Sequence, residues 1–147
     1  MARTSDTRAS RAKPGAPADE LDGLSEKELV SLQRSALLAE RAAYMEQAEA
    51  LKAEADSLAQ EAEPGDVQFD EESGEGGTTT VDRERDLALS AQARATVDEI
   101  DHALAKIDAG SYGLCESCRR PIVRARLAAL PYARLCVACK SGGLSRR

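Results

Sequence analysis

The sequence predicts a mainly α-helical protein: a long antiparallel coiled-coil hairpin followed by a small cysteine-rich module. Three observations support this fold class. Apolar residues recur every seven positions over residues 30–58, and a Gly- and Pro-containing acidic segment, 64–80, separates two helical patterns. All four cysteines lie between residues 115 and 139. An aromatic content of 3%, against 42% hydrophobic residues, suits helices that pack closely around a thin core.

The chain is expected to divide into three parts: a disordered basic N-terminal tail (1–20), the hairpin with its acidic tip loop (21–110, loop 64–80), and the four-cysteine module with a basic C-terminal tail (111–147). The tail is polar and contains two prolines, a composition that does not support a packed core.

The first helix is expected to begin after Ser25, because Ser25 and Glu28 have the spacing of a capping box. No Gly or Pro interrupts the chain from there to Pro64, which allows about 39 helical residues, roughly 58 Å. Its seam follows a heptad pattern. The heptad positions are Val30, Leu37, Tyr44, Leu51 and Leu58, with Ala48, Ala55 and Ala62 beside them.

The second helix is expected to begin near Thr80 or Val81 and to end at Gly110, a C′ glycine. At about 29 residues, roughly 43 Å, it would be shorter than the first, whose first turns, near Leu29, Val30 and Leu32, should then pack on the cysteine module. Its apolar stripe is Leu89, Ala93, Val97, Ile100, Leu104 and Ile107. A small core of Ile122, Val123, Leu127 and Leu130 is expected beneath the cysteines.

The cysteines form two Cys-x-x-Cys pairs, separated by seventeen residues. Two such pairs at this spacing indicate one tetrahedral, structural zinc ion, and a closed set of four thiolates leaves no position for water or substrate. The sequence therefore predicts a non-enzymatic metal site. Its ligands are Cys115, Cys118, Cys136 and Cys139.

We expect a cytoplasmic protein without a membrane partner. The sequence holds no apolar run of eighteen residues, and no apolar segment follows the basic residues at the N-terminus. A reducing compartment would keep the cysteines available to metal.

Charge is unevenly distributed along the chain. The formal net charge is −6, with twelve acids against two arginines in residues 54–86, whereas residues 119–147 hold eight basic residues and no acid. The acidic tip lacks a nucleophile or a fixed base, which argues against an active site there. His102 lies on the polar side of the second helix and is expected to be exposed. Basic residues that could contact a partner are Arg119, Arg120, Arg124, Arg126 and Lys140.

The cysteine module resembles a known family. The pattern Gly-Ser-Tyr-Gly-x-Cys-Glu-x-Cys from Gly110, followed by Pro121-Ile, Arg126-Leu-x-Ala-x-Pro and Leu135-Cys-x-x-Cys-Lys, is similar to the C-terminal zinc finger of DksA/TraR regulators. With the Arg83-Glu-Arg-x-Leu-x-Leu segment included, the resemblance extends over about residues 25–140. The family pattern often has glycine after the second cysteine, where this chain has Arg119.

The resemblance implies a monomeric transcription regulator that binds RNA polymerase directly. In that family a coiled coil enters the secondary channel, where acidic residues at its tip act near the polymerase active site. The family tip motif, Asp-x-x-Asp-x-Ala, aligns with Glu72, Glu75 and Gly77 by helix register from Cys115. An alternative alignment through Asp82 leaves Thr79 and Glu84 at the other two positions.

Two further expectations concern ligands. Family members that bind guanosine tetraphosphate use basic residues on the second helix and after the last cysteine, and here only Lys140 matches. The corresponding helix positions hold Gln92, Ala95, Thr96 and Glu99, so dependence on this nucleotide is not expected. Two alternative functions stay open: weak or specific nucleic-acid binding through the basic C-terminus, and a redox switch in which oxidation of the cysteines releases zinc.

Overall fold

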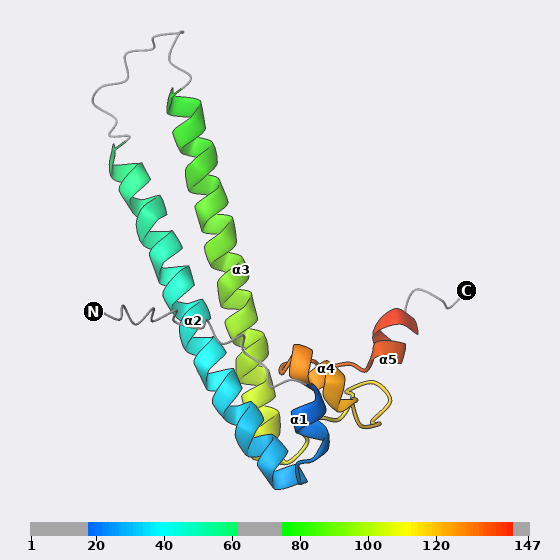
Figure 1. Cartoon of the computed structure of the whole chain (residues 1–147). Coiled ribbons are helices and arrows are strands. Elements are labelled where there is room, and N and C mark those ends of the chain that lie inside the picture. Colours follow the sequence, from blue (N-terminus) through cyan, green and yellow to red (C-terminus); the bar gives the residue numbers. More distant parts are fainter. Residues whose placement is uncertain (1–17, 62–74, 143–147) are drawn as a thin grey trace, which may run out of the picture.

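The structure, a computed structural model, describes residues 18–61 and 75–142; for Glu75 and Gly76 it defines only the backbone. Within these ranges the elements are α1 (Ala18–Asp22), α2 (Glu26–Glu61), α3 (Glu75–Ala109), α4 (Arg124–Ala129) and α5 (Val137–Gly142). Helices α2 and α3 run side by side in opposite directions, and α1, α4 and α5 lie beside one end of the pair (Figure 1). The predicted fold class, a helical hairpin with a C-terminal cysteine module, is confirmed.

The hairpin is held by a narrow seam along α2 and α3. Buried residues recur at intervals of three and four along α3 and near the start of α2, and at seven or eight farther along α2, which is the spacing of a coiled-coil interface. On α2 the buried seam positions are Gln33, Leu37, Glu40, Ala48 and Ala55; on α3 they are Asp86, Ser90, Ala93, Val97, Ile100 and Ala103. The half of the seam away from the cysteines contains small or polar residues: Ala48 and Ala55 on α2, and Asp86 and Ser90 on α3. Leu37 and Ile100, near the cysteine module, have fully buried side chains.

Helix α3 begins earlier than predicted. It starts at Glu75 rather than near Thr80, so that α2 has 36 residues and α3 has 35. The expectation of a much shorter second helix was therefore wrong. Glycine is a poor helix former, which argued against helix at Gly76 and Gly77. Extending an existing helix is nevertheless far easier than nucleating one, because each added residue gains a backbone hydrogen bond.

The predicted stripe of α3 was wrong at Leu89. Its side chain is 40% exposed, whereas the neighbouring Ser90 is buried. The Ser90 hydroxyl donates to the Ala48 carbonyl of α2 over 2.8 Å. This contact brings the two backbones close together, and a leucine at the same position would hold them apart. With Ser90 in the seam, the adjacent Leu89 points about 100° away from it around the helix and faces solvent.

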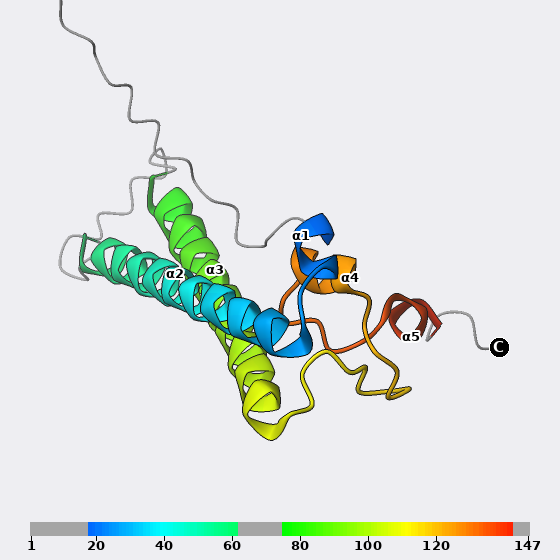
Figure 2. The ribbon, with the colours of Figure 1, turned by 60° about the horizontal axis from the view of Figure 1, so that its bottom comes forward.

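Helix α1 was not predicted. Residues 18–20 were assigned to an irregular tail, and they form the start of this helix; residues 1–17 lie outside the described part of the chain. Leu21 of α1 is fully buried against Leu29 and Ala128. Figure 2 shows α1 lying against α4 beside the base of the hairpin. A five-residue helix has too weak a sequence pattern to stand out, and it is stabilised by this packing.

Both predicted boundaries at the base of the hairpin are confirmed by their caps. The backbone N–H of Ser25 donates to Glu28 Oε2 over 2.8 Å, which is half of a capping box. Gly110 has φ +76°, and a Schellman motif ends α3: Gly110 N–H donates to the Ile107 carbonyl and Ser111 N–H to the Lys106 carbonyl. Within the described residues, no helix is both long and apolar enough to cross a membrane.

The module after α3 is built around a small core of its own. Cys115, Ile122, Leu127 and Ala133 are buried in it, with Leu130 packed alongside. Val123, which was expected in this core, is 63% exposed. It is the N-cap residue of α4 and has an extended backbone conformation, and the turn into the helix directs its side chain outward.

Candidate metal centre and its attachment to the hairpin

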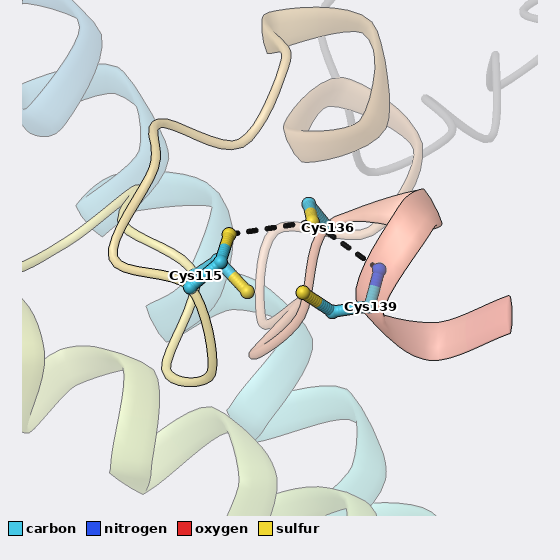
Figure 3. A group of neighbouring side chains, drawn as sticks. Cys115, Cys136 and Cys139 are labelled. Atoms are coloured by element: carbon cyan, nitrogen blue, oxygen red, sulfur yellow. Dashed lines mark hydrogen bonds between the residues drawn. The ribbon is translucent and has the colours of Figure 1, made fainter. Parts of the chain in front are cut away.

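The four cysteines predicted as ligands converge at one point. Their sulfur atoms all lie within 4.8 Å of one another. Figure 3 shows Cys115, from the loop after α3, pointing toward Cys136 and toward Cys139 of α5. The backbone N–H of Cys139 donates to the sulfur of Cys136 over 3.4 Å. All four thiols are free, so no disulfide competes with a metal ion.

The geometry fits zinc. A Zn–S bond of about 2.3 Å places the sulfurs of a regular tetrahedron about 3.8 Å apart. The sulfur atoms of Cys118 and Cys136 are 3.8 Å apart. The four cysteines are therefore the ligands of one structural zinc ion, as predicted. Because four thiolates fill the coordination sphere, this zinc holds the fold and offers no site for a reaction.

The electrostatics of the cluster also favour a divalent cation. Backbone N–H groups, first that of Cys118, point at the Cys115 sulfur and lower the pKa of that thiol to about 6. Hydrogen bonds to the other three sulfurs, first to that of Cys136, raise the pKa of Cys139 to about 12. The four thiols therefore do not all lose their protons by themselves. A bound metal ion supplies the positive charge that stabilises four thiolates side by side.

The first cysteine turn requires an unusual backbone conformation. Arg119 has φ +64°, and among the described non-glycine residues it alone has positive φ. Its N–H donates to the Cys115 carbonyl over 3.0 Å and closes the turn. This is the left-handed region that favours glycine, which explains why a glycine suits this position in the family pattern. The arginine adopts the same turn.

A buried polar contact joins the module to α2. Gln33 Nε2 donates to the Leu127 carbonyl over 2.8 Å and to the Tyr112 hydroxyl over 3.1 Å. Tyr112 in turn donates to the Pro131 carbonyl over 2.8 Å, and burial raises the pKa of its hydroxyl to about 12. The expectation that the first turns of α2 pack on the module is thus confirmed for Leu29, and the buried glutamine adds a polar contact. Leu32, which was expected to pack there too, is 40% exposed.

Helix α3 contacts the module through residues to which the sequence analysis gave no role. Nε2 of His102 is hydrogen-bonded to the carboxylate of Glu116, which lies between two zinc ligands. This hydrogen bond is the largest cause of the lowered pKa of Glu116. Arg134 makes a two-pronged contact with Glu99 of α3, with N–O distances of 2.6 and 2.9 Å. His102 is therefore not a free surface residue, although 39% of its side chain is exposed.

The basic residues predicted to meet a partner fall into two groups. Arg124 donates to the carbonyls of Leu21 and Leu24 and pairs with Glu26, so it ties α1 and α2 to α4. Arg126 Nε donates to the Leu135 carbonyl over 2.9 Å. The remaining three are exposed: Arg119, Arg120 and Lys140.

The tip residues lie largely outside the described residues. Glu72 belongs to the segment 62–74, and Glu75 is the first residue of α3. Gly77 is helical and exposed, and a side chain added there would meet no heavy atom within 4 Å. In the alternative alignment, Thr79 and Asp82 lie in the first turns of α3.

Comparison with known proteins confirms the resemblance noted from the sequence. Residues 110–142 match the family described as the prokaryotic dksA/traR C4-type zinc finger. General stress protein 16O of Bacillus subtilis (strain 168) is 34% identical over 86 residues, 58% of this chain and 53% of that protein. RNA polymerase-binding transcription factor DksA of Caulobacter vibrioides is 38% identical over 60 residues, 41% of this chain and 42% of that protein.

Structural similarity to a solved protein extends over more of the chain than the sequence similarity to the curated relatives does. The structure of transcription factor DksA2 from Pseudomonas aeruginosa matches with a TM-score of 0.73 over 88% of this chain and 96% of that chain, at 24% identity. Residues 110–142 are therefore a zinc finger of the DksA/TraR type, carried on a hairpin with the DksA2 fold. The chain spans 31%, 27% and 53% of the length of three curated relatives that it matches.

Proposed function

We propose that this protein is a non-enzymatic transcription regulator that binds RNA polymerase directly and inserts the far end of its hairpin into the secondary channel. The observation that carries the proposal is the position of that end: α2 ends and α3 begins at the pole opposite the cysteines (Figure 1). A helix of 35 residues is about 52 Å long. The hairpin can therefore act at a distance from the surface that anchors the finger.

The acting groups in this proposal are Glu72 and Glu75, with Gly77 beside them. Glu75 begins α3, which places its backbone at the far pole. A carboxylate delivered to a polymerase active centre would alter the electrostatics around the catalytic cations and the nucleic acid. The name of the Caulobacter relative, an RNA polymerase-binding transcription factor, supports this partner.

Nucleic-acid binding through the basic C-terminus has less support. Arg124 and Arg126 donate to backbone carbonyls of the chain, and Arg134 is paired with Glu99. Arginines engaged in this way have fewer N–H donors left for phosphate oxygens. We therefore place the exposed Arg119, Arg120 and Lys140 at the protein surface that meets the polymerase.

The test combines a binding assay with in-vitro transcription by purified bacterial RNA polymerase. Replacing Glu72 and Glu75 together by alanine should abolish the effect on transcription and leave polymerase binding nearly unchanged. The matched control replaces Glu46 and Glu49, two exposed acids halfway along α2, and should retain the effect.

Two results would contradict the proposal. The first is a parent protein that does not bind the polymerase. The second is a tip variant that regulates as well as the parent. Loss of DNA binding on replacing Arg119 and Arg120, with the tip variant unaffected, would instead favour the nucleic-acid function.

A further inference from the structure

One face of α3 contacts both cysteine turns of the finger. Glu99, His102 and Lys106 are spaced by three and four residues, so their side chains lie on the same side of the helix. His102 and Lys106 contact Glu116, and Glu99 contacts Arg134. Glu116 directly follows one zinc ligand, and Arg134 lies two residues before another.

The first turn is held on both sides of its buried ligand. His102 is hydrogen-bonded to the Glu116 carboxylate, and Lys106 Nζ lies 3.8 Å from the same oxygen. Lys106 Nζ also donates to the Leu114 carbonyl over 3.1 Å. The residues before and after Cys115 are thus both tied to α3, and Cys115 itself is fully buried.

The second turn is held by a contact of fixed geometry. The Arg134 guanidinium donates to both carboxylate oxygens of Glu99, over 2.6 and 2.9 Å. Bidentate arginine–carboxylate pairs fix the relative orientation of the two side chains as well as the distance between them. The backbone N–H of Glu116 donates to the Arg134 carbonyl over 2.9 Å, which links the two cysteine turns to each other.

We propose that Glu99, His102 and Lys106 are positioning residues for the zinc ion: they hold the two cysteine turns at the separation that tetrahedral coordination requires. None of them touches the metal. Groups that orient metal ligands from outside the ligand set commonly change metal affinity 10–100-fold, and these three residues would do so through the residues that flank the ligands.

The charges around the site agree with this role. Four thiolates on one zinc ion carry a formal charge of about −2, and the carboxylate of Glu116 follows one of these ligands in sequence. Lys106 offsets that carboxylate, while Glu99 balances Arg134. Because the positioning residues belong to the hairpin, zinc binding and the packing of α3 on the finger stabilise each other. This inference does not depend on the proposed function.

The test measures zinc affinity of the full chain by competition with a chromophoric chelator. Glu99→Ala and His102→Ala should each weaken zinc binding by about 10–100-fold. His102→Gln should recover most of the loss, because an amide N–H can still donate to Glu116. The matched control is Asp101→Ala, which removes a comparable ion pair, with Arg41 of α2 at 2.6 Å, in place of one with the finger. Its zinc affinity should equal that of the parent.

A second measurement reports on ligand geometry. Cobalt(II) bound in place of zinc gives absorption bands that depend on the arrangement of the thiolates, and these should change in Glu99→Ala and His102→Ala but not in Asp101→Ala. Circular dichroism verifies that each variant is helical; should an alanine variant unfold, Glu99→Gln takes its place. A weakening of less than about tenfold in the folded variants would overturn the proposal. An equal loss of zinc affinity in Asp101→Ala would also overturn the proposal, because the loss would then follow from a less stable hairpin rather than from the contacts with the finger.

Discussion

Arg119 is the clearest case of a residue whose backbone conformation conflicts with its side chain. Its φ of +64° closes the first cysteine turn, and a left-handed conformation costs a residue with a Cβ about 1–2 kcal/mol. Glycine avoids this cost but loses more entropy on folding, about 0.5–1 kcal/mol. The position therefore favours glycine by a small net margin.

Arg119→Gly is accordingly expected to raise the free energy of unfolding by up to about 1 kcal/mol. Urea unfolding at saturating zinc measures the change. Arg120→Gly is the matched control: its backbone is not left-handed, so the same substitution should lower stability. If Arg119→Gly were as destabilising as the control, the strain assigned to this turn would be absent.

At the scale of the single helix, α2 carries a polar seam. Gln33 is fully buried and donates two hydrogen bonds to the finger, whereas the nearby Glu40 is 9% exposed. Burial raises the pKa of the Glu40 carboxyl above its ordinary value. The charged form of a buried carboxyl is less stable inside the protein than in water. The folded state therefore loses stability as the pH rises above the ordinary pKa of glutamic acid, where the unfolded chain ionises first.

Glu40→Gln should therefore stabilise the protein at pH 7. The gain should shrink as the pH falls and vanish below the ordinary pKa of a glutamic acid, where the wild-type carboxyl is protonated in both folded and unfolded states. Urea unfolding of the two proteins at pH 7 and at pH 4 measures this difference. A variant less stable than the parent at pH 7 would show that the Glu40 carboxylate makes a stabilising contact that outweighs its burial.

At the scale of the whole molecule, the zinc finger packs against one end of the α2–α3 hairpin, and the two parts are stabilised in different ways. The hairpin is held by the seam between α2 and α3, while the finger depends on four sulfurs, a core of few residues and the contacts from α3. The hairpin seam extends far beyond the finger (Figure 1). The two parts should therefore respond differently to loss of zinc.

Removal of zinc by a chelator is expected to unfold the finger and leave most of the hairpin helical. The finger contributes the six-residue helices α4 and α5, so circular dichroism should show only a small loss of helix. Hydrogen exchange should rise sharply in residues 111–142 and modestly in the part of α3 that contacts them. Collapse of the entire helical signal would instead show that zinc is required for the hairpin as well.

The sequence by itself determined the elements that follow from periodicity and spacing. The capping box at Ser25, the C′ glycine at Gly110 and the set of four cysteines are local signals, and each was predicted correctly. In the heptad pattern of α2, Leu37, Ala48 and Ala55 are buried and the other described positions are half-buried, while Ala62 lies outside the described residues. Such features depend on neighbours a few residues away. The pattern around the cysteines also sufficed to indicate the family of the finger.

Only the tertiary structure decided which residues face one another across elements. Ser90 replaces Leu89 in the seam, Arg124 fastens α1 to α4, and His102 reaches Glu116, although fourteen residues separate these two in the chain. The apolar pattern of the sequence does not single out these polar residues, because each pairing arises from the angle at which two elements meet. A side chain that appears solvated along its own helix can therefore support the metal site of the next module.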